Sequence, residues 1–145
     1  MLRLSKKADY APMAMRHLAA DALQGTASAR AIAERYDIPV ERLAKVLQQL
    51  TRRGFLASHI GSHGGYHLAR PTTAISVAAV IEAIDGPLAI TACGPADERC
   101  DQFSKGNVRD PLWKVKDRIV DALQTFTISE MARGEVTGRP LKVNR

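Results

Sequence analysis

The sequence predicts a mainly helical protein with a single small β-hairpin. Apolar residues recur at three- and four-residue steps over most of the chain, which is the spacing of amphipathic helices. One stretch departs from this pattern, because between Leu56 and Arg70 two short β-prone runs flank a cluster of glycines. The chain has 145 residues, enough for one domain of ordinary size with a buried core and an appended helix.

The composition favours an anionic partner. The formal net charge is +6 and the pI is near 9.7, as in proteins that bind nucleic acid or, less often, a membrane surface. Aromatic residues make up only 5%, which argues against stacking platforms for single strands. No apolar run approaches the roughly 20 residues of a membrane span, and the N-terminus has no signal-peptide pattern. We therefore expect a cytoplasmic protein without a membrane partner.

The first helix is expected to begin at Ser5 and to run to about Leu23, with Gly25 as its C-cap. Pro12 lies well inside it, where it removes one backbone hydrogen bond and should bend the helix. The inner face is predicted to consist of Ala8, Ala11, Met15, Leu18 and Ala19. Asp9 has two interpretations: a favourable position at the positive end of the helix dipole, or a ligand.

The stretch from Ser28 to Arg53 predicts two short helices around a tight turn. The first is ARAIAERY, residues 29–36, the corner is Asp37-Ile38, and the second covers residues 39–53. The apolar face of the second helix is predicted to hold Val40, Leu43, Leu47 and Leu50. The opposite face collects donors suited to base edges and phosphates: Arg42, Lys45, Gln48, Gln49 and Arg52. A basic second helix is typical of a helix-turn-helix, although any amphipathic pair shares the apolar pattern.

The hairpin that follows raises the case for DNA binding. After Gly54, an expected C-cap, residues 56–60 and 66–70 predict two strands around a glycine-rich turn, as in the wing of a winged helix. The turn residues expected near a phosphodiester backbone are Ser62, His63, Gly64 and Gly65. The alternative is a metal site at His59, His63 and His67. Since no carboxylate or cysteine lies nearby, polar contacts near phosphate are the better account.

The next segments are a packing helix and a long connection. Ser76 is expected to cap the helical segment VAAVIEAIDG, residues 77–86, which is closed by Gly86-Pro87. Residues 88–109 are long for a structureless connection, which usually indicates function or disorder. This connection contains Cys93 and Cys100, which in a chain without an export signal are expected to be reduced thiols or ligands rather than a disulfide.

The last strong helix is expected over residues 110–126, with Pro111 at its first position. It carries one apolar stripe, made of Leu112, Val115, Ile119, Leu123 and Phe126. This stripe must be buried, either on the helix's own domain or, more economically, on a second copy of the chain, and a two-fold dimer suits a palindromic DNA site. A short closing helix over residues 127–133 and a flexible basic tail over residues 134–145 complete the chain.

The order of these segments resembles the Rrf-two type of bacterial winged-helix transcriptional regulators, the group that contains iron–sulfur-cluster-sensing repressors. The resemblance is carried by LSKKADYA, AIAERYDIPVERLAKVLQQLTRRGFL, the wing GSHGGYHLARP and the run ISVAAVIEAIDGP, followed by the cysteine-bearing loop. It covers roughly residues 1–133. Within the group, the opening residues and the cysteine spacing are most similar to regulators of the SUF cluster-assembly system.

The resemblance implies a homodimer joined through the long helix, with a [2Fe-2S] or [4Fe-4S] cluster held by three loop cysteines. A fourth ligand comes from the loop or from a carboxylate on the partner subunit's first helix. Cys93 and Cys100 match the first two cysteines, and Asp9 matches the carboxylate. The third cysteine, expected near Gly106, is absent, and so is a histidine ligand after it. Because clusters take four strong ligands, a labile cluster, a thiol switch and a loop without a sensor all remain open.

The sequence therefore predicts a homodimeric DNA-binding regulator, a repressor of iron–sulfur or redox-linked genes. Its parts are a winged helix-turn-helix domain (residues 1–87), a sensor loop (88–109), dimerisation and closing helices (110–133) and a tail (134–145). Arg42, Lys45 and Gln49 are assigned to bases, and Arg52, Ser62 and the wing glycines to the backbone. Family wings often carry an arginine before the first glycine, where this chain has Ile60.

Two rival functions remain at this stage: a winged-helix regulator that responds to a small molecule, and a winged-helix protein-interaction module. An enzyme is disfavoured, because the sequence shows no nucleophile–base constellation and no phosphate-binding loop.

Overall fold

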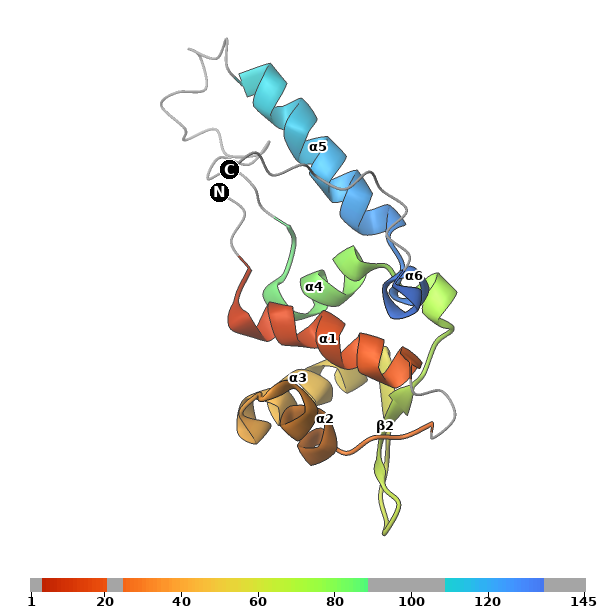
Figure 1. Ribbon diagram of the computed structural model, residues 1–145. Coiled ribbons are helices and arrows are strands. Elements are labelled where there is room, and N and C mark those ends of the chain that lie inside the picture. The colour runs from red at the N-terminus through yellow and green to blue at the C-terminus, as the bar shows by residue number, and fades with distance from the viewer. Residues whose placement is uncertain (1–3, 21–24, 89–108, 135–145) are drawn as a thin grey trace.

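The computed structural model describes residues 4–20, 25–88 and 109–134. Its helices are α1 (Lys6–Ala20), α2 (Ala29–Tyr36), α3 (Val40–Arg52), α4 (Val77–Asp85), α5 (Arg109–Thr125) and α6 (Ile128–Arg133), with a short 3-10 turn η1 (Thr72–Ala74). The strands are β1 (Leu56–His59) and β2 (Gly65–Leu68). Helix α1 crosses the middle of the molecule, with α2, α3 and the hairpin on one side and α5 on the other (Figure 1). The predicted mainly helical architecture with one hairpin is confirmed.

Polar caps fix where several helices begin. The hydroxyl of Ser5 accepts a hydrogen bond of 3.1 Å from the Ala8 amide, and Ser76 accepts one of 3.1 Å from Ala79, as predicted. Ser28 caps α2 in the same way. The corner of the helix-turn-helix is also confirmed, because Asp37 adopts a left-handed conformation with φ of 55°.

Helix α5 begins at Arg109, one residue before the predicted start at Asp110. The predicted end of the first helix at Leu23 lies outside the described residues. The same holds for both cysteines and for the tail from residue 135 onwards.

The hairpin is tied to the segment that precedes α2. Strands β1 and β2 are antiparallel, with Leu56 opposite Leu68 and His59 opposite Gly65. On its other edge β2 pairs with Ala27, because the Tyr66 amide donates to the Ala27 carbonyl at 2.8 Å and the Ala27 amide donates back at 3.0 Å. These two bonds hold the wing against the helix-turn-helix.

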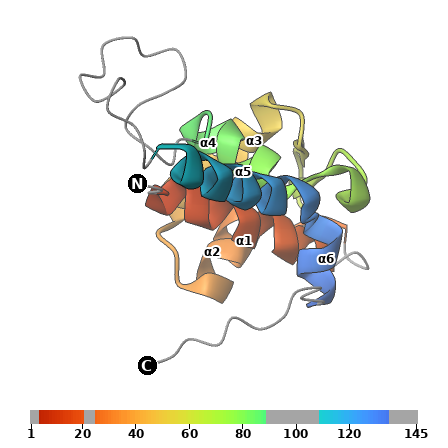
Figure 2. The same ribbon diagram turned by 90° about the horizontal axis from the view of Figure 1, so that it is seen from above.

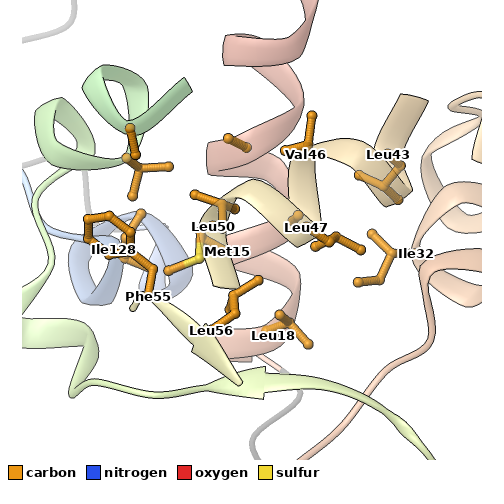
Figure 3. Close-up of a cluster of buried hydrophobic side chains, with 14 of the residues drawn as sticks. Met15, Leu18, Ile32, Leu43, Val46, Leu47, Leu50, Phe55, Leu56 and Ile128 are labelled. Atoms are coloured by element: carbon orange, nitrogen blue, oxygen red, sulfur yellow. The ribbon is translucent and has the colours of Figure 1, made fainter. Parts of the chain in front are cut away.

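The core lies where α1, α2, α3, α4, β1 and α6 meet (Figure 3). The largest fully buried side chains are Met15, Ile32, Leu43, Val46, Leu47, Leu50, Ile75, Val80 and Ile128. The predicted inner face of the recognition helix was wrong at one position: Val40 is 40% exposed, and Val46 is buried in its place. Val46 follows Leu43 by three residues and precedes Leu50 by four, so the same helical period accounts for it.

The chain after α5 returns to the core. The Ile128 amide donates to the Ile75 carbonyl at 2.9 Å, and the Val77 amide donates to the Phe126 carbonyl at 2.9 Å. Thr127 and Glu130 form a capping box that starts the predicted closing helix, α6. These contacts anchor the C-terminal end of α5 beside α4.

Helix α5 is the most projecting helix of the fold (Figures 1 and 2). Near its C-terminal end, Leu123 and Phe126 pack against the core, whereas Val115 is 53% exposed. Within the described part of the predicted stripe, the domain therefore covers Leu123 and Phe126 and leaves Val115 exposed. Among the described helices, none is long and apolar enough to cross a membrane.

Candidate nucleic-acid interface

Burial of one face of α3 decides which of its side chains reach solvent. Leu43, Val46, Leu47 and Leu50 point into the core, so the predicted polar face turns outward. Its exposed residues are Glu41, Arg42, Lys45, Gln48 and Arg52. Within the described residues, Arg42, Lys45 and Arg52 form no ion pair with another side chain. Three cationic side chains without an ion-pair partner on one exposed helix face suit an anionic duplex.

Glu41 belongs to this face, although the sequence analysis did not include it. It lies in the first turn of α3, where the partial positive charge of the helix end favours a carboxylate. The N-terminal residues of a recognition helix are those that contact base edges, and glutamate accepts from the amino group of cytosine. The signal was available in the sequence, because Glu41 precedes Lys45 by four residues on the same face.

Gln49 departs from its predicted role as a base contact. Its side-chain nitrogen donates to the Ala83 carbonyl at 2.8 Å and to the Ile84 carbonyl at 3.4 Å, both near the end of α4. Gln49 follows buried Val46 by three residues, so it lies at the border between the exposed and buried faces and turns inward. Its side chain is therefore already engaged within the protein, whereas Gln48 is exposed and free to contact a base.

The wing presents its tip to solvent. Ser62 and His63 are exposed, as their predicted role near a phosphodiester backbone requires, and Ile60 is fully exposed, with a relative accessibility of 102%. The hairpin projects from the body at the end of the molecule opposite α5 (Figure 1). The wing and α3 thus belong to the same part of the fold.

Gly64 and Gly65 have a structural role beyond the predicted contact with phosphate. A Cβ atom on Gly64 would lie 2.5 Å from the His59 carbonyl oxygen, and one on Gly65 would lie 2.6 Å from the Ala27 carbonyl oxygen. The first glycine therefore allows the tight turn, and the second allows the wing to approach the segment before α2. The geometry requires both glycines before any contact with phosphate is considered.

Arg70 joins the base of the wing to the end of α3, which the sequence analysis also missed. Its guanidinium lies 4.8 Å from the centroid of the Phe55 ring and contacts the Arg53 carbonyl at 3.5 Å. Phe55 is buried. Arg70 follows β2 by two residues, and Phe55 directly precedes β1. The contact between Arg70 and Phe55 therefore joins the two strands at the end of the hairpin that lies away from its turn.

The histidines of the wing do not form a metal centre. The rings of His59 and His67 lie 5.1 Å apart on neighbouring strands, as expected. No group of three or more metal-ligating side chains occurs among the residues that the structure describes. The role of the wing histidines near phosphate stays a prediction.

Comparison with known proteins decides the family. A model of the Rrf2 (Rrf-two) family, described as iron-dependent transcriptional regulators, matches residues 4–134. This chain belongs to the Rrf2 family. It is therefore a helix-turn-helix transcriptional regulator and not an enzyme, as the sequence predicts.

Individual relatives of this chain are also HTH-type transcriptional regulators. The transcriptional regulator IscR of Erwinia tasmaniensis is 33% identical over 135 residues, which cover 92% of this chain and 81% of that protein. Two HTH-type regulators of Mycobacterium tuberculosis are 43% identical over 88 residues, which cover 61% of this chain and just over half, 55%, of theirs.

Solved Rrf2-type structures show the same fold. IscR of T. potens superposes with a TM-score of 0.71 at 29% identity, covering 92% of this chain and 88% of that one. CymR, the global cysteine regulator of B. subtilis, gives a TM-score of 0.78 at 24% identity, covering 93% of this chain and 99% of that one. The winged helix-turn-helix with an appended long helix is thus confirmed as the Rrf2 fold.

Of the ligand set that the Rrf2 resemblance implies, the structure places only Asp9. Its side chain is exposed in the first turn of α1, and its amide donates to the Ser5 carbonyl at 3.1 Å. An exposed carboxylate at this position is accessible to a second subunit. Cys93 and Cys100 lie outside the described residues, so their role as ligands stays a prediction.

Proposed function

We propose that this Rrf2 regulator acts as a homodimeric repressor that binds a palindromic duplex through α3 and the wing. The observation that carries the proposal is the exposed face of α3, where Arg42, Lys45 and Arg52 have no ion-pair partner within the described residues. Such free cations, beside a projecting wing, match the phosphates and base edges of a major groove. The cytoplasm is the proposed location, because a regulator that binds DNA must share a compartment with it.

The roles of the individual side chains follow from their positions. Base edges are assigned to Glu41, Arg42 and Lys45, in the first two turns of α3, because recognition helices enter the groove by their N-terminal part. Gln48 is assigned to a base edge as well, because it lies one turn after Lys45 and is exposed. Phosphates are assigned to Arg52, Ser62 and His63, which lie at the end of the helix and on the wing.

The second subunit is proposed to cover the outer half of α5. Val115 is 53% exposed on the predicted stripe, whereas Leu123 and Phe126, nearer the end of the helix, pack against the core. An exposed valine on a projecting helix favours a two-fold contact with the same helix of another copy. Two copies then present two recognition helices to the two halves of the site.

The sensor is proposed to be the segment with Cys93 and Cys100, completed by Asp9 of the partner subunit. Two thiolates and a carboxylate are one ligand short of the four that an iron–sulfur cluster takes, so a cluster in this segment is expected to be labile. A [2Fe-2S] or [4Fe-4S] cluster would supply sensitivity to iron and oxidants. The regulated genes are proposed to be iron–sulfur or redox-linked, with SUF-type cluster assembly as the first candidate.

Two measurements on one preparation test this function. Protein purified without oxygen is assayed for iron and acid-labile sulfide, and a duplex selected from random sequence is titrated by fluorescence anisotropy before and after iron removal. We expect iron with sulfide, selection of an inverted repeat and an affinity that changes when iron is removed. Failure to enrich any sequence would contradict the DNA-binding proposal. Absence of sulfide with an unchanged affinity would contradict the cluster.

Repression needs a test of its own. The selected duplex is placed in a promoter, and transcription is measured in vitro with and without the protein. We expect the protein to reduce transcription. An increase would assign the opposite direction of regulation to the same DNA-binding surface.

A further inference from the structure

The C-terminal end of α4 is held by the recognition helix. The last carbonyl groups of a helix have no partner within it and must find one elsewhere. The Gly86 amide donates a hydrogen bond to the Glu82 carbonyl. The side-chain nitrogen of Gln49 donates to the Ala83 carbonyl at 2.8 Å and to the Ile84 carbonyl at 3.4 Å. Gln49 therefore caps α4 from the last turn of α3.

The same end of α4 is also held by the start of α1. The Asp85 carboxylate accepts from the Ser5 amide at 2.9 Å and from the Ser5 hydroxyl at 2.5 Å. Ser5 is in turn the N-cap of α1, four residues before Asp9. Three consecutive residues of α4, from Ala83 to Asp85, thus bind α3 on one side and α1 on the other.

We propose that Gln49 is a positioning residue for DNA reading: through its bonds to Ala83 and Ile84 it sets the orientation of α3 relative to α4. We call the hydrogen bonds from Gln49 to Ala83 and Ile84 the tether. Lys45 lies four residues before Gln49 and Arg52 three residues after it, so both lie about one helical turn from the tether. Because an α-helix moves as a stiff body, a displacement at Gln49 also displaces the side chains assigned to bases. Contacts with base edges are directional, so a small displacement reduces discrimination between bases.

The tether also has a regulatory consequence, and this part rests on the proposed function. The cysteine-bearing segment follows α4 directly in the sequence. A change in that segment that moves the end of α4 reaches the recognition helix through Gln49. Asp85 and Ser5 carry the same change to the first turn of α1, where Asp9 lies. The end of α4 is therefore the part of the fold through which such a change would reach both α3 and α1.

Adjacent glutamines provide a matched pair of variants. Gln49→Met keeps the length of the side chain and loses the donor, whereas Gln48→Met makes the same change at an exposed position of the same helix. Gln49→Lys restores a donor and suits the negative end of α4. The first measurement is amide hydrogen exchange of the full chain over residues 82–88. We expect exchange to become about fivefold faster in Gln49→Met and to stay at the wild-type rate in Gln48→Met and Gln49→Lys.

The second measurement is base discrimination, determined with single-base variants of the selected duplex. Gln49→Met is expected to lose about tenfold in the ratio of specific to non-specific affinity, spread over several base pairs, with an unchanged salt slope. Gln49→Lys is expected to restore the ratio, and Gln48→Met to change the preference at one base pair. A loss confined to one base pair in both Gln49 variants would overturn the proposal, because it identifies Gln49 as a base contact.

The two measurements separate this inference from the proposed function. Unchanged hydrogen exchange in Gln49→Met overturns the tether whether or not the chain binds DNA. Faster exchange together with an unaltered specificity ratio overturns the positioning role. If wild-type protein selects no sequence, the proposed function and the positioning role both fail, while the exchange result still decides whether the tether exists.

Discussion

The guanidinium of Arg70 lies 4.8 Å from the centroid of the Phe55 ring. Phe55 is buried between the end of α3 and the start of β1, and Arg70 follows β2, so this pair joins the two ends of the wing to the recognition helix. A cation over an aromatic face is worth about 0.5–1 kcal/mol at an exposed site. The wing is therefore oriented from its base, and not only by the turn at its tip.

Replacement of Arg70 tests this contact. Arg70→Met keeps an unbranched side chain over Phe55 and loses the charge, so we expect the free energy of unfolding to fall by about 0.5–1 kcal/mol in urea titrations. Arg35→Met, at an exposed arginine of α2, is the control and should unfold like wild type. Equal stabilities of the two variants would show that the ring contact contributes nothing.

The close approach at Gly65 leads to a prediction about folding. A Cβ atom there would lie 2.6 Å from the Ala27 carbonyl oxygen, so Gly65→Ala must push the wing away from the segment before α2. We expect a loss of about 1–3 kcal/mol in the free energy of unfolding, measured in urea. Ser62→Ala, at an exposed position of the same turn, should lose less than about 0.5 kcal/mol. A Gly65→Ala variant as stable as wild type would contradict the packing described for the wing.

Local chemistry in the sequence was enough to place most of the elements. Ser5 and Ser76 were predicted as caps because a hydroxyl before an apolar periodic run satisfies orphan amides, and both make that bond. The corner at Asp37 and the buried Leu43, Leu47 and Leu50 likewise follow from short-range pattern. The caps, the corner and the buried leucines each depend only on residues within a few positions along the chain.

What the sequence did not show depends on residues far apart in the chain. Gln49 lies on the border of a helix face, and only the position of α4, more than one element away, determines that it turns inward. Gly65 is required by Ala27, and Arg70 acts through Phe55. Ile128 is buried because α6 returns to pair with the segment before α4. The apolar periodicity of a single segment cannot predict contacts between residues that lie far apart in the chain.

The open half of α5 predicts the effect of a charge on assembly. Val115→Asp should convert the proposed dimer into monomer, because an aspartate in an apolar two-fold contact is buried without a partner. Sedimentation velocity at micromolar concentration measures this. Lys114→Asp places the same acid on the next residue, off the stripe, and should leave the dimer intact. A wild-type protein that sediments as monomer would contradict the assignment of α5, and so would a Val115→Asp dimer.

Ile60 predicts how the wing contributes to DNA affinity. A fully exposed isoleucine at the wing supplies no charge to a minor groove, whereas an arginine is attracted into a narrow, A·T-rich one. Ile60→Arg should therefore bind duplex DNA more tightly, by about 1 kcal/mol, with the gain concentrated on duplexes that are A·T-rich beside the half-sites. Ile60→Gln controls for polarity without charge. An equal gain in both variants would show that the charge does not enter the groove.

The most direct test of the account is the salt dependence of duplex binding by wild type, Arg42→Ala and Lys45→Ala. Fluorescence anisotropy is measured on the selected duplex and on a scrambled duplex between low and high salt. We predict that the logarithm of the affinity falls linearly with the logarithm of the salt concentration. Each variant should lose about 1–3 kcal/mol on the selected duplex and much less on the scrambled one. Binding that is independent of salt, or variants that match wild type on the selected duplex, would contradict DNA reading by the exposed face of α3.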